Sequence, residues 1–326
     1  MGALPDALTR FLTQVEARLN ERLSRPPGTR DTLMQAARHL CLLPGGKRGR
    51  PILVHTFAEA LGVTGEPVLE IAVGAELIHS ASLLHDDVVD AGMFRRGRPT
   101  ANAQWGNLVS VMAGDLLLSD SLLRLNRLSP AVGNTALETV REMTWAAIAE
   151  IESRGDLSHS QAALASVAEG KTGSLFGWCG KAIATLAGEA EAARCFDAFG
   201  RELGIAFQIA DDIRDVTGTD PGKPRYQDIV SRTPSLPIAL AVKHDEHLRK
   251  RISEAWAPGA MNLEKAKELG TALWCTGAID EATQVMELHL SRAVDALGPY
   301  REGPVGERLL HWAISVARGV ALKDAA

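Results

Sequence analysis

The sequence has few of the features that would place it in several common protein classes. Its four cysteines, Cys41, Cys179, Cys195 and Cys275, are scattered and form no C-x-x-C pair. This spacing argues against a disulfide framework and predicts free thiols in a reducing compartment. No run reaches about 18 uncharged apolar residues, so we expect no membrane span. Residues 1–23 mix charges into their apolar positions, which argues against a signal peptide. We therefore expect a cytoplasmic protein.

The chain also lacks a basic excess and any composition break that would mark a linker. Its net charge of −5 and pI near 6.0 argue against bulk nucleic-acid binding. Apolar residues make up 46% and charged residues 23%, as in ordinary globular proteins. No stretch has a convincing strand pattern. We expect residues 1–326 to form a single all-α domain, a helical bundle with a central elongated cavity.

Proline, glycine and capping residues predict where the helices begin and end. We expect helices over 5–19, from a Thr29 cap to near Leu43, over 76–90 and over 107–128. Further helices run from Ser129-Pro130 to Glu152 and from Ser158 or Ser160 onward, weakened at 170–173 and divided at Gly188. Residues 217–237 hold six glycines and prolines, which predicts a long functional loop. Residues 238–326 predict four or five shorter helices.

Two acid clusters of the same spacing carry the first functional signal. Asp86-Asp87-x-x-Asp90 and Asp211-Asp212-x-x-Asp215 each stand at the end of a long apolar helix. Helical residues four apart lie on one face, so the outer carboxylates of each cluster stack. His79 lies about two turns before Asp86 on nearly the same stripe. Hard oxygen donors, without a Cys/His quartet for zinc, predict Mg²⁺ and a diphosphate held through it.

Basic segments supply the matching positive charge. A glycine-loosened turn over 44–51 carries Lys47, Arg48 and Arg50, and Arg95-Arg96 follows the first acid cluster. Glycines let backbone N–H groups approach an anion. A second glycine-flanked segment, 170–173, exposes Lys171. These segments converge with the acids only if their helices run side by side with their ends together.

These motifs, in this order, resemble those of the all-trans isoprenyl diphosphate synthases, the polyprenyl synthetase family. The similarity covers nearly the whole chain. The matching residues are Gly-Gly-Lys-Arg-x-Arg-Pro at 45–51, His79, both acid clusters, Arg95-Arg96-Gly97, Pro99-Thr100, Gly114-Asp115, Lys171-Thr172, Phe207-Gln208, Gly222-Lys223 and Asp228.

The resemblance implies a head-to-tail condensation of isopentenyl diphosphate with an allylic diphosphate. Three Mg²⁺ ions would be held by Asp86, Asp90 and Asp211, assisted by Asp87, Asp212 and Asp215. Arg95, Lys171 and Lys223 would neutralise the allylic diphosphate, with Thr172 and Gln208 beside the reacting carbon. Isopentenyl diphosphate would bind Lys47, Arg50, His79 and Arg96. A homodimer is the family's usual assembly.

Two departures from the family pattern concern charged and polar residues. The family's Gly-Glu-x-x-Gln run before Lys171 is replaced by Ala146-Ala147-Ile148-Ala149-Glu150. A second lysine usually follows Lys223, and this chain has Thr233 there. Arg232, beside it, is a candidate substitute. These changes put turnover rate or substrate preference in question.

Product length follows from the residues below the first acid cluster. Ala81 and Ser82, five and four positions before Asp86, lie about 6–8 Å deeper along a helix. Their small side chains leave a tunnel open, as in the family's longer-chain members. The floor would be set by Ile78, Met143 or Trp145. We expect a product longer than C15.

Two other functions remain open on sequence alone. A class I terpene cyclase shares the bundle and the first acid motif, but its second metal motif is typically of the Asn/Ser/Glu type. It also lacks the Lys47, Arg50 and Arg96 set. A non-catalytic subunit of a heteromeric prenyl synthase would explain the departures at Glu150 and Thr233. The two complete acid motifs argue against a decayed site.

Overall fold

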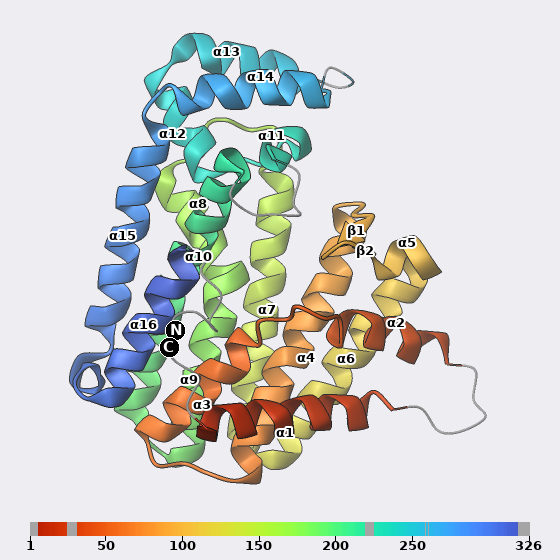
Figure 1. The fold of residues 1–326 in the computed structure, drawn as a ribbon, viewed down its shortest axis with the longest axis vertical. Helices are drawn as coiled ribbons and strands as arrows, with labels where there is room; N and C mark the ends of the chain where they lie inside the picture. Colours follow the sequence, from red (N-terminus) through yellow and green to blue (C-terminus); the bar gives the residue numbers. More distant parts are fainter. Residues whose placement is uncertain (1–5, 25–30, 219–224, 258, 260, 319–326) are drawn as a thin grey trace.

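Nearly every described element of the structure is a helix, which confirms the expected all-α class. The computed structural model describes residues 6–24, 31–218, 225–257, 259 and 261–318, and Figure 1 shows their arrangement. The elements are α1 Asp6–Arg22, α2 Thr32–Cys41, α3 Gly49–Ala60, α4 Glu66–Val89, β1 Phe94–Arg95, β2 Arg98–Pro99, α5 Ala101–Trp105, α6 Asn107–Leu128, α7 Pro130–Glu152, α8 Gln161–Ala168, η1 Glu169–Gly173, α9 Ser174–Ala187, α10 Ala190–Thr217, α11 Gln227–Ser231, α12 Leu236–His244, α13 Glu246–Ala255, α14 Leu263–Trp274, α15 Ala278–Ala296, η2 Gly298–Arg301 and α16 Pro304–Arg318.

Side-chain caps set several helix starts. The Ser129 hydroxyl accepts from Val132 N–H at 3.4 Å, and Pro130 occupies the first turn of α7, as predicted. Ser160, rather than Ser158, caps α8. The Asp31 carboxylate caps α2 by accepting from Met34 N–H at 2.9 Å. The expected Thr29 start is therefore wrong, and Thr29 itself lies outside the described residues.

The expectation of no strand is also wrong, at one place beside the first acid cluster. β1 and β2 pair antiparallel, with Phe94 opposite Pro99 and Arg95 opposite Arg98. Arg96 and Gly97 between them have φ of 51° and 73°, the conformation of the tight turns that join paired strands. Two-residue strands are too short to show a period-2 pattern, so the sequence gives no sign of them.

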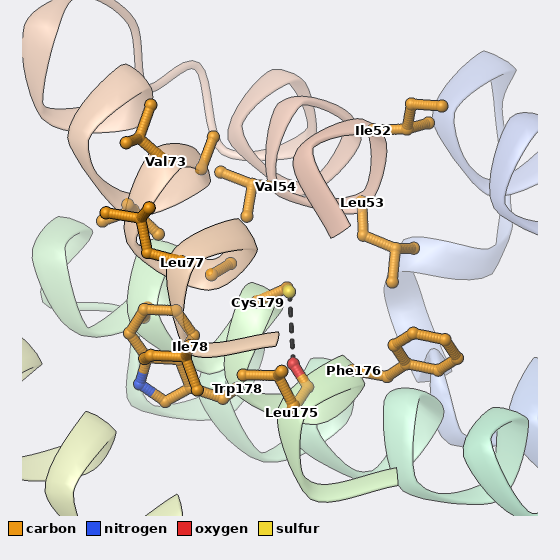
Figure 2. Packing of buried hydrophobic residues seen from close by; sticks show 14 of the residues in the cluster. Ile52, Leu53, Val54, Val73, Leu77, Ile78, Leu175, Phe176, Trp178 and Cys179 are labelled. Carbon is orange, nitrogen blue, oxygen red and sulfur yellow. Dashed lines mark hydrogen bonds between the residues drawn. The ribbon is translucent and has the colours of Figure 1, made fainter. Parts of the chain in front are cut away.

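The largest apolar core lies between α3, α4 and α9. Figure 2 shows Val54 of α3, Leu77 and Ile78 of α4, and Trp178 of α9 packed together. All four are at most 1% exposed. A second core, which includes Trp256 and Ile252, joins α10 to the helices α11 to α15. Among the described residues, α12 to α16 are five α-helices, where four or five shorter helices were expected over 238–326.

α4 is the helix that most resembles a membrane span. It is the one described helix long and apolar enough to cross a bilayer by length and composition. However, 72% of its most apolar window is buried inside the molecule. It is covered by α3, α6 and α9, so this packing identifies it as a core helix. All four cysteines are free thiols, as expected.

The glycine-flanked segment 170–173 does not break its helix but winds it more widely. Residues Glu169–Gly173 form a π-helical turn between α8 and α9. A Cβ on Gly170 would lie 2.7 Å from the Ala146 Cβ of α7, and one on Gly173 would lie 2.7 Å from the Arg201 carbonyl of α10. Glycine at both positions therefore lets this turn lie close between α7 and α10.

The predicted loop over 217–237 is partly helical. α10 extends to Thr217, α11 occupies Gln227–Ser231, and α12 begins at Leu236. Residues 219–224 lie outside the described part of the chain. The predicted site residue Lys223 is among them.

Candidate active site

One cavity brings residues from both acid clusters together. It has a volume of about 520 Å³, and Asp86 and Asp90 of α4 lie on its wall with Asp211 of α10. Two acidic helix ends, more than a hundred residues apart in sequence, thus face the same space. The other polar lining residues are Arg50, His79, Ser82, His85, Thr144, Glu150, Lys171, Thr172 and Gln208.

The middle acid of the first cluster faces the strand pair rather than the cavity. Asp87 is 4% exposed, and Arg95 Nη2 donates to its Oδ1 at 2.8 Å. Asn102 Nδ2 donates to the Asp87 carbonyl at 3.2 Å. Asp87 therefore anchors the segment that follows α4, and the Arg95 guanidinium is paired with the Asp87 carboxylate.

The second cluster is anchored differently. Asp212 accepts from Gln208 Nε2 at 2.9 Å and from Leu236 N–H at 3.4 Å, which ties α10 to α12. Asp215 accepts from Gln227 N–H at 2.8 Å and so holds the start of α11. Burial raises the pKa of Asp212 to about 7, since a charged carboxylate away from water is disfavoured.

Each of the three acids on the cavity wall has a cationic neighbour. Lys171 Nζ lies 4.0 Å from Asp86, Arg154 Nη2 lies 2.5 Å from Asp90, and Arg214 Nη2 lies 3.3 Å from Asp211. The motifs predicted Lys171. The two arginines were missed, because an arginine near the end of a helix carries no spacing signal of its own.

Lys171 extends from the π-helical turn into the cavity. Burial opposes its charge, but Glu150 and Asp86 outweigh that effect and raise the pKa of Lys171. Glu150 forms an ion pair with it, and both are cavity residues. Burial raises the pKa of Asp86. The departure at Glu150 thus places a fourth carboxylate within this cavity.

Two of the four residues expected to bind isopentenyl diphosphate lie on the cavity wall. They are Arg50, whose guanidinium lies 4.9 Å from the centre of the Phe176 ring, and His79. Burial, followed by nearby arginines, lowers the pKa of His79 well below its usual value, so its imidazole is neutral. The other two, Lys47 and Arg96, are exposed residues outside the wall.

The basic turn also contains a structural arginine. Arg48 pairs with Glu16 at 2.5 Å and with Glu76 at 2.9 Å, and it donates to the Cys41 carbonyl at 2.9 Å. Its charge is neutralised within the protein. Arg48 therefore fixes the turn, and neither Lys47 nor Arg50 takes part in these ion pairs.

The lower cavity wall is apolar and rests on α4, α6 and α7. Ile78, Leu118, Val140 and Met143 line it, together with Ser82, whose hydroxyl donates to the His79 carbonyl at 2.8 Å. Ala81 is fully buried and lies outside the wall. The expectation that Trp145 closes the floor is wrong, because its side chain is 71% exposed on α7.

Arg232 does not take the place of the missing lysine in this structure. Its Nη1 donates to the Trp256 carbonyl at 3.2 Å, and it contributes to neither cavity wall. Thr233 lines a neighbouring cavity of about 330 Å³. That cavity shares Glu150, Lys171 and Gln208 with the first.

The donor set fits Mg²⁺ with a phosphate ligand. Within the described residues, no group of three His, Cys, Asp or Glu side chains is arranged to hold a metal alone. Mg²⁺ prefers oxygen, keeps several waters, and is commonly held by one or two carboxylates plus substrate phosphates. Asp86, Asp90 and Asp211 supply such carboxylates around one space.

Comparison with known proteins agrees with this fold and site. A model of the polyprenyl synthetase family matches residues 30–273. The chain is 34% identical over 267 residues to a (2E,6E)-farnesyl diphosphate synthase of Mycobacterium tuberculosis, covering 77% of this chain and 73% of that one. It is 33% identical over 296 residues to heptaprenyl diphosphate synthase component 2 of Geobacillus stearothermophilus, covering 89% and 91%.

A solved structure extends the likeness to nearly every residue. The polyprenyl synthase of Caulobacter crescentus, complexed with calcium and isoprenyl diphosphate, has a TM-score of 0.87 and 25% identity, covering 99% of both chains. Fold and site thus define an all-α prenyltransferase of the isoprenoid synthase type. The chain belongs to the all-trans isoprenyl diphosphate synthase family, also called the polyprenyl synthetase family.

Proposed function

We propose that the protein catalyses the Mg²⁺-dependent head-to-tail condensation of isopentenyl diphosphate with an allylic diphosphate, giving an all-trans polyprenyl diphosphate longer than C15. The observation that carries this proposal is the shared cavity wall of Asp86, Asp90 and Asp211. Arg50 and His79 lie on the same wall, and apolar residues continue it. A polar end for two diphosphates and an apolar end for a chain suit this reaction.

The cationic and acidic residues bind and orient the allylic diphosphate. Asp86, Asp90 and Asp211 hold the metal, for which we propose three ions, while Lys171 lies 4.0 Å from Asp86 and reaches the same diphosphate. Bound Mg²⁺ supplies charge stabilisation for the leaving pyrophosphate. Lys223 and Arg95 assist in this proposal, although Arg95 is paired with Asp87 in this structure.

The allylic carbon–oxygen bond ionises first, and the acceptor alkene then adds to the allylic carbocation. Arg50, Lys47 and Arg96 bind the diphosphate of isopentenyl diphosphate, with neutral His79 donating a hydrogen bond. A new carbon–carbon bond forms at the allylic carbon, and pyrophosphate leaves with the electron pair of the broken bond. Loss of a proton from the acceptor, taken by the pyrophosphate, restores a double bond. Thr172 and Gln208 present their dipoles to the positive charge.

Product length depends on the apolar wall. Ser82 lies one turn below Asp86, and Ile78, eight residues below it, is about 12 Å deeper. Ile78 and Met143 both line the cavity and are the proposed floor. Relatives named for both shorter and longer products leave the length open, and the small Ser82 side chain supports the longer one.

The test is product chromatography with purified protein, Mg²⁺, isopentenyl diphosphate and each short allylic diphosphate. We expect a polyprenyl diphosphate longer than C15, and Ser82→Phe should shift it to a shorter product with the condensation retained. A neutral hydrocarbon or alcohol would favour the terpene cyclase. Absence of product from the purified chain, restored by a second subunit, would favour the component of a heteromeric synthase.

We further propose a homodimer through the outer faces of α6 and α7. Leu108 and Leu123 on α6, and Leu137 and Trp145 on α7, are between 50% and 75% exposed. They recur at helical spacing, so each set forms one unpartnered apolar stripe. Light scattering during size exclusion should give twice the monomer mass. Trp145→Glu should yield a monomer, and a monomeric wild-type protein would contradict this assembly.

A further inference from the structure

The departure at Thr233 leaves the site with one lysine fewer than the family pattern. Thr233 carries no charge, and the neighbouring Arg232 donates to the Trp256 carbonyl. A diphosphate leaving group needs positive charge around its developing negative charge. The structure offers another cation close to the same segment.

That cation is Arg154, in the turn that ends α7. Its Nη2 lies 2.5 Å from Asp90 Oδ1, and Asp90 lines the cavity. The Arg154 side chain is 24% exposed, and its Nε is buried without a hydrogen-bond partner among the described residues. This guanidinium therefore keeps an unused donor beside a proposed metal ligand.

The turn carrying Arg154 is fixed to the segment that carries the departure. Gly155 N–H donates to the Arg232 carbonyl at 2.8 Å, one residue before Thr233. Arg154 thus lies in a turn that is hydrogen-bonded to the residue before Thr233. The backbone bond holds these two segments together whatever the side chains do.

We propose that Arg154 binds the allylic diphosphate and supplies the positive charge that Thr233 does not. This inference rests on the proposed function. A divalent ion on Asp90 competes with Arg154 for the carboxylate, and a partly buried arginine left without an anion is costly. Diphosphate oxygens match the forked donors of a guanidinium. Arg154 pairs with Asp90 in the free enzyme and binds the diphosphate when Mg²⁺ and substrate are bound.

The test compares Arg154→Gln with the wild type in pyrophosphate binding, measured by calorimetry with and without Mg²⁺. We expect the Mg²⁺-dependent binding to weaken about tenfold, as loss of a charged hydrogen bond predicts. Binding of Mn²⁺ alone, followed by electron paramagnetic resonance, should become tighter because Asp90 loses its competing cation. Damage to the fold would weaken both. Arg124→Gln, which removes an exposed ion pair with Asp120 on α6, is the matched control.

A rescue experiment tests whether Arg154 supplies the positive charge that is absent at Thr233, rather than affecting only the surroundings of Asp90. In the Arg154→Gln background, Thr233→Lys should restore most of the lost pyrophosphate affinity and lower the KM for the allylic diphosphate, with the KM for isopentenyl diphosphate unchanged. Unchanged pyrophosphate affinity in Arg154→Gln, or no rescue by Thr233→Lys, would overturn the proposal. A wild-type protein that makes no prenyl diphosphate would instead overturn the proposed function.

Discussion

The two acid clusters have the same sequence pattern and different structural surroundings. In the first, the outer acids Asp86 and Asp90 line the cavity, and the middle acid anchors the strand pair through Arg95. In the second, only Asp211 lines that cavity. Its companions Asp212 and Asp215 hold the backbone of the segments that follow α10. The same spacing thus provides two cavity carboxylates on one wall and one on the other.

This difference follows from where each helix ends. α4 ends at Val89, within the first cluster, so Asp90 stands at the exposed helix terminus. α10 continues through its cluster to Thr217, so its acids remain on a regular helix that other segments pack against. A repeated motif is therefore no evidence for repeated roles. Each carboxylate has its role from its neighbours.

The strongest test of the comparison removes one cavity acid from each wall. Asp86→Ala and Asp211→Ala should each lower kcat by about 10³-fold or more, since each removes charge stabilisation of the leaving group. Circular dichroism and the unfolding temperature should stay near the wild-type values. Asp120→Ala, on the exposed surface of α6, is the control. Near-normal rates in both variants would contradict the metal assignment.

A second test concerns the buried middle acid of the second cluster. With its pKa raised to about 7, above the usual value near 3.8, Asp212 binds a proton in the folded protein that the unfolded chain releases. Stability should therefore fall as pH rises between about 4 and 7, by up to about 1.4 kcal/mol per pH unit. Burial also raises the pKa of Asp228, so urea titrations of metal-free protein should show a smaller slope in Asp212→Asn than in the wild type. Equal slopes would contradict the assignment.

The smallest expected effect separates the two outer acids. Asp215→Ala should destabilise the protein by about 1 kcal/mol, the typical cost of losing a helix-capping side chain, because Gln227 N–H loses its acceptor. Asp90→Ala removes the ion-pair partner of Arg154. Because Asp90 is exposed, this change should cost less stability than Asp215→Ala, and it should lower the rate. Thermal unfolding and steady-state kinetics of both variants measure this contrast. A larger loss of stability in Asp90→Ala would reverse it.

The sequence predicts most of the helices and the convergence of the acid clusters, because apolar periodicity and D-D-x-x-D spacing are local signals. It does not predict that Asp86 and Asp87 have different roles. The partner of Asp87 is Arg95 on the strand pair, and that of Asp86 is Lys171 on the cavity wall. The sequence does not show which face of α7 Trp145 occupies, because this helix has apolar residues both on the cavity wall and on its exposed face. Arg154 was missed because its importance comes from Asp90, 64 residues away.

The π-helical turn at Glu169–Gly173 has a consequence for how the chain can vary in length. A π turn accommodates one more residue than regular α-helix would. Because the wider turn absorbs that extra residue, deleting one residue would return the segment to regular pitch and leave α8 and α9 on nearly the same faces. Lys171 lies within the turn, so it would lose the position beside Glu150 and Asp86. A deletion here would therefore move one cavity cation while preserving the helices on both sides.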